Sequence, residues 1–592
     1  MFFQEYGISP AYSAKIYKAF GANTIEEIRA NPYKLANEIF GIGFKTADKI
    51  AMNIGVDLKS SFRVCSGIKY VLSQVASSSG HTYYPDYLLK EYTSKLLEVE
   101  IENINDAVVS LLFDKSIYIE KDEGFDRVYL SPYFFAEIGV SRMLYELSNV
   151  DFKGDLSDFE DKISEVQAEE DITLAEKQKN AIKEALTNGV MVITGGPGTG
   201  KTTIIKSIIK LLHGEGYEVV LAAPTGRAAK RMSEATGFEA KTIHRLLEIG
   251  FMGPDDELKF QRIESNPIDA DVIIIDEVSM VDILLMNHLL KAISPGTRLI
   301  LVGDVDQLPS VGPGNVLKDI ISSNMIKTVK LNEIFRQAEE SMIIVNAHRI
   351  NKGDSPYLNA KDKDFFFMPR NNGAEIIRTV IELSSKRLPN TYGYDPLKHI
   401  QVLTPTRKGA VGVTNLNIEL QKVLNPDSRQ KNEKTYRGFT FREGDRVMQV
   451  KNNYNLKWEK PGQPNIEGVG VFNGDMGIVQ KIDNEDQSIT VLLDDEKVIE
   501  YDFGILDELE PAYAITIHKS QGSEFPVVIL PLFPGPQILM TRNLLYTAIT
   551  RARGLVILVG VKSVLNEMIG NEKETLRYSS LSKKLRLCFQ GP

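Results

Sequence analysis

The sequence predicts a multidomain α/β protein built on parallel sheets, and three observations support this prediction. With 592 residues the chain is too long for one hydrophobic core, so we expect about three to five domains. An apolar run at residues 190–194 leads into a glycine loop and then into apolar residues at helical spacing. Further apolar runs at 219–223, 272–275 and 299–302 each end in polar residues, which is typical of parallel strands at a site-bearing sheet edge.

Composition and charge exclude several classes of protein. Hydrophobic residues make up 43% of the sequence and the formal net charge is −10, as in an ordinary globular protein. The longest apolar runs are shorter than a membrane span and no signal peptide opens the chain, so we expect a cytoplasmic protein without membrane contact. Two cysteines, Cys65 and Cys588, provide neither a disulfide framework nor a zinc cluster. Because counterion release requires local Lys and Arg, any nucleic-acid site must be a local groove.

Residues 1–60 contain an internal repeat that predicts a paired helical unit. Gly7, Ile8, Lys15, Ile16 and Gly21 recur with the same spacing as Gly41, Ile42, Lys49, Ile50 and Gly55. The second copy, Phe40 to Lys45, resembles the helix-hairpin-helix motif of DNA repair proteins, which contacts DNA phosphates through a glycine hairpin. This resemblance implies DNA contacts at Gly41, Gly43 and Lys45. In the first copy Ser9 replaces a glycine, so that hairpin could be structural, and an ordinary helical turn is the alternative reading.

Residues 61–150 are expected to form a winged-helix-like domain. Helical patterns are followed by two short strands, at 116–120 and 127–130, around a polar turn. Such a wing could contact duplex DNA or brace neighbouring domains. The acidic stretch that follows predicts a linker at 151–172.

The glycine loop carries the strongest chemical signal. Gly195, Gly200, Lys201 and Thr202 match the pattern G-x-x-x-x-G-K-[ST]. Glycines let backbone N–H groups surround phosphate oxygens, and the following helix directs its N-terminus at the same anion. We predict that Lys201 reaches the β and γ phosphates of a nucleotide and that Thr202 holds Mg²⁺, with a chance glycine loop as the alternative. The predicted contacts are Gly195, Gly196, Gly198, Thr199, Gly200, Lys201, Thr202 and Thr203.

Two adjacent carboxylates, Asp276 and Glu277, follow the buried strand predicted at 272–275. Such a pair suits metal-assisted phosphoryl transfer, in which one carboxylate holds Mg²⁺ and the other polarises the attacking water. We assign Asp276 to the metal, directly or through water, and Glu277 to the base. A solvated strand end is the alternative.

These motifs belong to a longer series. It comprises Leu174 to Gln178, the glycine loop, Thr225 to Arg227, Thr242 to Leu246, Asp276 and Glu277, Gly303 to Pro309, Leu331 to Gln337, Thr404 to Thr406, Thr516 to Phe525, and Tyr546 to Arg553. In this order the series resembles the superfamily 1 helicases, most closely the RecD-like branch 1B, which includes the stand-alone RecD-type enzymes and the exodeoxyribonuclease V alpha-subunit family. The resemblance implies two RecA-like motor domains with parallel sheets that share one ATP.

The resemblance also implies nucleotide contacts outside the glycine loop. Gln178 would read adenine, Gln307 would lie beside the γ-phosphate, and Glu524 would meet the ribose. Arg336 and Arg551 would stabilise transition-state charge, and an arginine from a second domain makes catalysis depend on closure. A surface salt bridge is the alternative for either arginine.

For DNA, the resemblance implies contacts to the strand backbone and travel from 5′ to 3′. The residues that match the strand-gripping motifs are Pro224, Thr225, Arg227, Thr242, His244, Thr404, Pro405, Thr516, His518 and Lys519. We expect mainly phosphate and sugar contacts with some base stacking, because a motor must tolerate every sequence.

Two insertions match the same family. A hairpin at 247–265 has a turn at 253–256, and it could be the pin that splits the duplex or a decoration. Short strands with glycine turns at 436–507 predict a small Src-homology-3-like barrel, which could contact DNA or be a structural insert. The motor domains are then expected at 173–335 and at 336–435 plus 508–587. Residues 588–592 resemble a tag remnant, and because long stand-alone members carry a further N-terminal domain, we expect a truncated chain.

The predicted function is that of an ATP-dependent DNA helicase in repair or recombination, with ATP and Mg²⁺ as cofactors. Its expected partners are single-stranded DNA and single-strand to duplex junctions, with no obligate subunit and with repair proteins as further candidates. An RNA-directed motor and an ATP-driven clamp that does not separate strands are the alternatives. A nuclease is disfavoured, because the sequence has no additional carboxylate cluster with a matching lysine.

Overall fold

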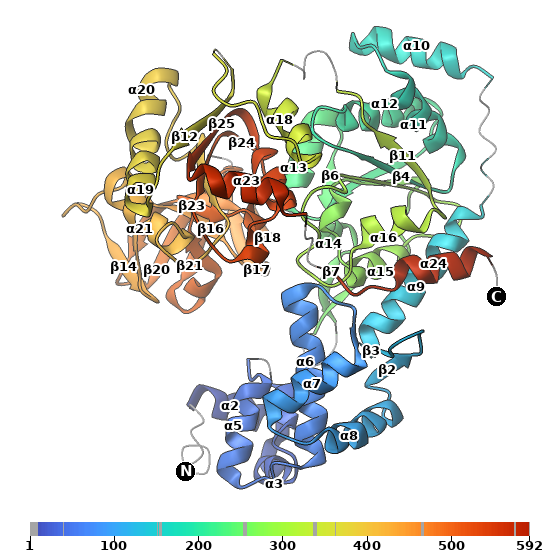
Figure 1. Ribbon diagram of the computed structural model, residues 1–592, viewed down its shortest axis with the longest axis vertical. Coiled ribbons are helices and arrows are strands. Elements are labelled where there is room, and N and C mark those ends of the chain that lie inside the picture. The colour runs from blue at the N-terminus through green and yellow to red at the C-terminus, as the bar shows by residue number, and fades with distance from the viewer. Residues whose placement is uncertain are drawn as a thin grey trace.

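The computed structural model describes residues 10–39, 41–150, 152, 157–252, 257–334, 340–361, 363–462, 467–572 and 576–590 (Figure 1). The predicted fold class is confirmed. Two parallel sheets flanked by helices lie side by side, and the helical N-terminal region lies below them in the view of Figure 1. In the described part of the chain, no helix combines the length and apolarity that crossing a membrane requires.

The N-terminal region is helical with one small antiparallel sheet. Its elements are α2 Pro10–Phe20, α3 Thr24–Ala30, α4 Lys34–Glu38, α5 Phe44–Ile54, α6 Ser61–Ser79, β1 Tyr83–Pro85, α7 Asp86–Leu97, α8 Ile101–Phe113, β2 Ile117–Glu120, β3 Arg127–Leu130 and α9 Ser131–Ser148. The strands pair in the order β1-β3-β2, next to α6, α7 and α8. One apolar cluster runs from Ile16 to Val128, so the helical repeat and the wing-bearing unit share a single core.

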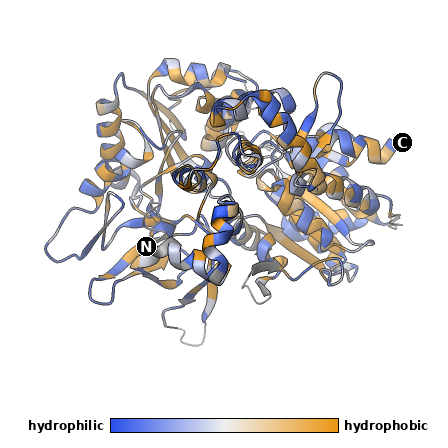
Figure 2. Cartoon of the chain, turned by 90° about the horizontal axis from the view of Figure 1, so that it is seen from below, coloured by the Kyte–Doolittle hydropathy of each residue, from blue (hydrophilic) through white to orange (hydrophobic). Residues whose placement is uncertain are grey.

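The first motor lobe, called motor 1 below, is built on a six-stranded parallel sheet with the order β11-β4-β10-β9-β5-β6. Its elements are α10 Phe159–Glu170, α11 Glu176–Thr187, β4 Val190–Gly195, α12 Lys201–Gly214, β5 Val219–Ala223, α13 Gly226–Thr236, β6 Ala240–Thr242, α14 Ile243–Leu246, β9 Val272–Ile275, α15 Ile283–Lys291, β10 Arg298–Gly303, α16 Val316–Ser323 and β11 Lys327–Leu331. The central strands are fully buried because helices cover both faces, and they are largely hydrophobic in Figure 2.

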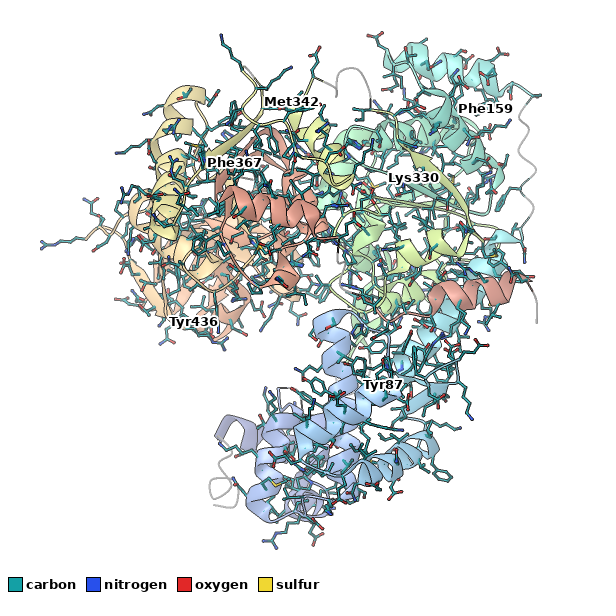
Figure 3. The ribbon with its side chains drawn as sticks, in the orientation of Figure 1. Tyr87, Phe159, Lys330, Met342, Phe367 and Tyr436 are labelled. Atoms are coloured by element: carbon teal, nitrogen blue, oxygen red, sulfur yellow. The ribbon has the colours of Figure 1, made fainter. Side chains whose placement is uncertain are left out.

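The acidic stretch expected to be a linker is instead a helix of motor 1. In α10, which begins at Phe159 (Figure 3), the apolar residues Phe159, Ile163 and Val166 face the motor 1 core at helical spacing. Lys206 on α12 pairs with Glu170 of α10. The stretch is an amphipathic helix whose acidic residues lie on the solvent face and pair with lysines of α12. Its acidic composition alone therefore indicates a linker.

The hairpin predicted in motor 1 is present. Strands β7 Ile249–Met252 and β8 Glu257–Phe260 pair antiparallel, with Ile249 opposite Phe260. The predicted turn at 253–256 lies outside the described residues. The base of the hairpin packs beside α14, which ends three residues before β7 begins.

The second motor lobe, motor 2, has a five-stranded parallel sheet in the order β12-β25-β24-β13-β23. Its elements are α18 Met342–Asn351, β12 Phe365–Pro369, α19 Gly373–Glu382, a π-helical stretch Leu383–Arg387, α20 Leu388–Tyr392, β13 Ile400–Thr404, α21 Val413–Leu424, β23 Ala514–Thr516, β24 Phe525–Leu532, α22 Arg542–Ile549, β25 Ala552–Gly560 and α23 Lys562–Gly570. Phe367 on β12 is buried in this core (Figure 3).

A small β domain interrupts motor 2 between α21 and β23. Its strands are β14 Glu433–Tyr436, β15 Phe439–Arg442, β16 Arg446–Gln449, β17 Asn453–Glu459, β18 Glu467–Val471, β19 Met476–Asp483, β20 Ser488–Leu493, β21 Val498–Asp502 and β22 Leu509–Pro511. The last seven pair antiparallel in the order β18-β17-β21-β20-β19-β16-β22 and enclose their own apolar core. We call this unit the β insert.

The C-terminal segment, residues 576–590, leaves motor 2 and returns to motor 1 and the N-terminal region. Its helix α24, Leu581–Gln590, lies beside α9 and α16 (Figure 1). Leu581 and Leu585 join the motor 1 core, and the ring of Phe589 lies 5.0 Å from that of Tyr145. This corrects one expectation, because residues 576–587 pack against motor 1 and the N-terminal region rather than in the core of motor 2. Residues 588–590 complete α24, and their resemblance to a tag remnant stays a prediction. We call residues 576–590 the strap.

Candidate active site

The glycine loop lies between the buried strand β4 and the start of α12. Gly198 and Gly200 have φ angles of 73° and 79°, a left-handed conformation that strongly favours glycine, and Gly200 is the N-cap of α12. A Cβ atom on Gly196 would lie 2.9 Å from the hydroxyl of Tyr546 in motor 2. The loop therefore combines free backbone geometry with a helix N-terminus, which is the arrangement that binds phosphate.

Lys201 is held within the loop that it follows. Its Nζ donates to the carbonyl oxygens of Gly195, at 2.6 Å, and Gly196, at 3.0 Å. Thr202 is exposed on the first turn of α12, and the next residue, Thr203, is half-buried. An incoming phosphate would exchange these carbonyl partners for stronger charge-assisted bonds to the ammonium.

Gln178 is buried against the loop. Its Nε2 donates to the carbonyl of Thr199 at 3.3 Å, and its Oε1 accepts from the backbone N–H of Ala175 at 3.0 Å. The side chain thus ties the start of α11 to the glycine loop. Its predicted contact with adenine stays a prediction.

Asp276 and Glu277 are both buried at the end of β9. Asp276 Oδ1 accepts from the backbone N–H of Glu277 at 2.8 Å, and Glu277 has a left-handed φ of 54°. Burial and the charge of Glu277 raise the pKa of Asp276. Burial opposes ionisation of Glu277 as well, but Arg231 and Arg551 outweigh it and lower the pKa of Glu277. The site therefore contains one carboxylate that is held ionised by cations from both lobes.

The donor set fits Mg²⁺ as it is bound in nucleotide sites. The described residues contain no group of three or more His, Cys, Asp or Glu side chains arranged to hold a metal ion. In nucleotide sites, however, Mg²⁺ takes only one or two protein oxygen ligands and completes its shell with phosphate and water. The Thr202 hydroxyl and the Asp276 carboxylate follow β4 and β9, which are separated in the sheet by β10 alone.

The two lobes meet beside this site through Arg551 and Gln307. Arg551, which is 2% exposed, donates from Nη2 to Gln307 Oε1 at 3.0 Å. Gln307 Nε2 donates to Asp304 at 3.1 Å, and the hydroxyl of Tyr546 donates to the same carboxylate at 2.7 Å. Residues of motor 2 thus contact the loop after β10 in motor 1. Arg336, the other predicted arginine, lies outside the described residues.

Arg231 is a site residue that the sequence reasoning missed. It lies on α13 and bridges Glu277 of motor 1 to Glu524 of motor 2, with N–O distances of 2.7 and 2.5 Å. Glu524 also accepts from Arg553 at 2.7 Å, so its predicted ribose contact would require these pairs to open. The available signal was the spacing of Arg227 and Arg231, which places both on one helix face directly after a buried strand.

Four threonines predicted to contact DNA have local backbone partners. Thr225 caps α13 by accepting from Ala228 N, and Thr242 caps α14 by accepting from Arg245 N. Thr404 donates to the carbonyl of Val411, and Thr516 accepts from Lys519 N. Pro224 and Pro405 follow β5 and β13 directly. All six residues therefore lie at or just after the carboxyl ends of parallel strands, where a shared binding edge is expected.

The charged DNA candidates are paired with carboxylates. Arg227 donates to Asp494 of the β insert at 3.0 Å, and Lys519 donates to Glu510 at 2.8 Å. His244 is half-buried and His518 is exposed at the surface. Desolvation of each ring lowers its pKa, which favours the neutral form. A DNA phosphate would have to compete with Asp494 and Glu510 for these cations.

Two hollows lie along this edge. One of 220 Å³ separates α13 and β6 from the β insert and includes Arg227, Thr242 and Phe472 in its lining. A larger one of 480 Å³ is lined by Gln307 to Val311, by His518 and by the end of α6. The candidate hairpin residues Gly41, Gly43 and Lys45 lie elsewhere, before and within α5 in the N-terminal region (Figure 1).

The family comparisons follow the order of these units along the chain. An AAA domain matches residues 173–365, and the UvrD-like helicase C-terminal domain matches 511–559. The HHH domain of ATP-dependent RecD2 DNA helicases matches 1–83, and the SH3 domain of ATP-dependent RecD-like DNA helicases matches 416–492. The HHH match extends into α6 and β1, consistent with the shared N-terminal core.

Individual relatives cover most of the chain. The ATP-dependent RecD2 DNA helicase of Deinococcus radiodurans is 31% identical, over 98% of this chain and 77% of its own length. The RecBCD enzyme subunit RecD of Mycolicibacterium smegmatis is 32% identical, over 69% of this chain and 75% of its own. Among solved structures, Bacteroides Pif1 bound to single-stranded DNA aligns with a TM-score of 0.39 at 22% identity, over 65% of this chain and 92% of that one.

Proposed function

Because this chain belongs to the ATP-dependent RecD2 DNA helicase family, we propose that it hydrolyses ATP between its two motor lobes and uses that cycle to move along single-stranded DNA. The observation that supports this most directly is the contact between Arg551 of motor 2 and Gln307 of motor 1. An arginine at this place joins the second lobe to the edge that carries the glycine loop and the carboxylate pair. Closure of the lobes and ATP hydrolysis are then coupled.

In this proposal each residue acts at a defined point. Lys201 binds the β and γ phosphates, and Glu277 accepts a proton from the attacking water. Mg²⁺, held by Thr202 and Asp276, would neutralise phosphate charge. Arg551, Gln307 and Arg336 stabilise the charge that develops on the transferred phosphoryl group, while Gln178 and Glu524 orient adenine and ribose.

The strand would lie across the carboxyl edges of both sheets. Pro224, Thr225, Arg227, Thr242 and His244 in motor 1 and Thr404, Pro405, Thr516, His518 and Lys519 in motor 2 are the proposed contacts, mainly to phosphate and sugar. The lobes alternate their grip, which gives travel from 5′ to 3′. We further propose that the β insert closes over the strand and that Gly41, Gly43 and Lys45 hold duplex DNA.

The hairpin β7-β8 is proposed to be the pin that splits the duplex. It follows α14 in the chain, directly after Thr242 and His244, which are two of the proposed strand contacts. The partners in this proposal are single-stranded DNA and forks. Repair proteins are secondary partners, no obligate subunit is needed, and the cell compartment is the cytoplasm.

A substitution in the glycine loop tests the proposal. Lys201→Ala should abolish ATP hydrolysis, because the phosphates lose their closest cation, and should leave single-strand binding largely intact. Lys210→Ala on the same helix is the matched control, since Lys210 pairs with Glu169 and lies outside the loop. ATP hydrolysis is measured with and without oligo-dT, and strand binding is measured by fluorescence anisotropy. Together they distinguish a loss of hydrolysis from a loss of DNA binding. Normal turnover in Lys201→Ala would refute the site.

Forked substrates test the helicase activity itself. A fork with a 5′ tail should be unwound and one with a 3′ tail should not, and replacing residues 253–256 with a shorter turn should lower unwinding while keeping strand-stimulated hydrolysis. Preferential unwinding of RNA forks would support the RNA motor, and hydrolysis without strand separation would support the clamp. Labelled DNA incubated with Mg²⁺ but without ATP should stay intact, and its cleavage would reveal a nuclease.

A further inference from the structure

Helix α13 connects the proposed DNA edge to the proposed catalytic base. Its N-cap is Thr225, its first turn carries Arg227, and Arg231 follows one turn later on the same face. Arg227 donates to the hydroxyl of Ser523 at 3.3 Å, and Arg231 pairs with the next residue, Glu524. One short helix between the two sheets (Figure 1) therefore contacts the strand path, the base and the second lobe.

Arg231 forms an ion pair with Glu277. Its Nη2 donates to Glu277 Oε1 at 2.7 Å and lies 3.7 Å from Asp276 Oδ2, while its Nη1 donates to Glu524 at 2.5 Å. The Arg231 side chain is 24% exposed and that of Glu277 is 7% exposed, so water screens this pair only weakly.

A carboxylate in such a pair is a poor general base. The guanidinium donates to Oε1 of Glu277, so that oxygen is not free to accept a hydrogen bond from the attacking water. While Arg231 bridges the two lobes in this way, Glu277 is not available to activate water.

We propose that Arg231 is a positioning residue that keeps Glu277 inactive until single-stranded DNA binds at the start of α13. The proposal rests on the proposed function, since it assumes that Glu277 activates the attacking water. A DNA phosphate that competes with Asp494 for Arg227 pulls on the first turn of α13. Because a helix moves nearly as a rigid body, Arg231 shifts with it and releases Glu277.

The geometry also explains why lobe motion assists this release. Arg231 bridges Glu277 in motor 1 and Glu524 in motor 2, and Arg553 binds the other oxygen of the same Glu524 carboxylate. A relative movement of the lobes changes the separation of the two glutamates, so one guanidinium cannot keep both bonds. Strand binding and closure thereby act on the same contact.

The test is the ratio of ATP turnover with and without DNA. In Arg231→Gln, turnover without DNA should rise at least about tenfold, because the base is released, while turnover with saturating oligo-dT changes little. The stimulation ratio should fall accordingly. Lys230→Gln removes one positive charge from the adjacent, exposed position on α13 and should leave both rates unchanged. An unchanged or lower DNA-free rate in Arg231→Gln would overturn the proposal and indicate that Arg231 acts in the closed, DNA-bound state.

Glu277→Gln separates this inference from the proposed function. If Glu277→Gln keeps full DNA-stimulated turnover, the assignment of the base fails. If it loses turnover but Arg231→Gln shows no rise, the inference alone fails. In the double variant the rise should vanish, and its persistence would show that Arg231 does not act through Glu277. ADP binding and the thermal midpoint, both expected to be unchanged, verify folding.

Discussion

Motor 1 has two interfaces of opposite character. It meets motor 2 through hydrogen-bonded polar and charged groups, such as Arg551 with Gln307 and Tyr546 with Asp304. It meets α9 and the strap through an apolar surface in which Val140, Leu144 and Leu585 are fully buried. Among the described residues, motor 1 contributes Leu308 alone to the apolar cluster of motor 2.

The difference indicates which interface can open. Polar bonds across the seam can be exchanged for water, nucleotide or phosphate at little net cost, because each partner finds another. Separating α9 and the strap from motor 1 would expose apolar side chains at a cost of about 25 cal/mol per Å². The N-terminal region and motor 1 are therefore expected to move together, while motor 2 moves against them.

The strap interface also contains charged groups, but buried hydrogen bonds and an ion pair hold them in place. Glu137 is 0% exposed and pairs with Lys584 at 2.8 Å. Its other oxygen accepts from Thr82, Ser579 and the backbone of Ser580. A buried carboxylate with this many partners cannot exchange them for water unless the strap unfolds, whereas the polar groups of the motor seam would gain new partners in the proposed nucleotide.

The largest expected effect comes from the seam. Arg551→Ala should lower kcat for ATP hydrolysis about a thousandfold, because transition-state charge loses its guanidinium, with little change in the thermal midpoint. Arg378→Ala, on the exposed face of α19, is the control and should change neither quantity. A strong loss of stability in Arg551→Ala with normal turnover would reverse the proposed contrast between the interfaces.

A substitution in the strap should have the opposite signature. Lys584→Met should cost about 3 kcal/mol of stability, since Glu137 keeps its charge in a buried place, while the turnover per folded molecule is preserved. Glu137→Gln with Lys584→Met should recover part of that loss. Thermal unfolding and trypsin cleavage provide the measurements, with Lys95→Ala in an exposed ion pair as the control without a detectable shift. If Lys584→Met melts like the control, the strap is not a fixed interface.

The pH dependence of stability should identify the strap as well. Burial raises the pKa of Asp319, whose carboxylate accepts from Ser579, to about 7. The folded state then keeps a proton that the unfolded chain releases above its ordinary pKa, so this stabilisation is full below about pH 4 and is lost as the pH rises through 7. Asp319→Asn cannot titrate, and from pH 5 to 8 wild type should lose about 2 kcal/mol relative to it.

Wild type and Asp319→Asn are compared at the same pH, so the contributions of other titrating groups to the stability cancel, including those that rise with pH. His81 is one such group, with its pKa lowered to about 4 by burial and by Arg577, so its contribution rises with pH between 4 and 6.5. Parallel melting curves for wild type and Asp319→Asn at every pH would contradict the buried carboxyl.

The smallest expected effect is at the end of the strap. Phe589→Ala should cost about 1 kcal/mol, because the half-buried ring loses its edge contact with Tyr145, and should leave ATP turnover unchanged. Differential scanning of both proteins measures the shift. An unchanged midpoint would mean that the final turn of α24 does not contribute to the fixed interface.

The sequence by itself determined the local chemistry. The glycine loop, the adjacent pair Asp276 and Glu277, and the hairpin between α14 and β9 were predictable, because phosphate cradles, strand ends and tight turns depend on neighbouring residues. The family motifs extended this to the two-lobed fold, which the comparisons bear out. The roles of the individual site residues stay predictions.

Only the tertiary structure decided which side chains are paired. Arg231 lies close in sequence neither to Glu277 nor to Glu524, and no periodicity in the sequence links these positions. The strap reaches the N-terminal region only because the chain returns across motor 1, and α10 is recognised as a packed helix only once α12 supplies its lysines. Pairings between distant residues depend on the whole packed arrangement, because burial and the absence of a better partner select each pair. Local sequence determines neither of these two factors.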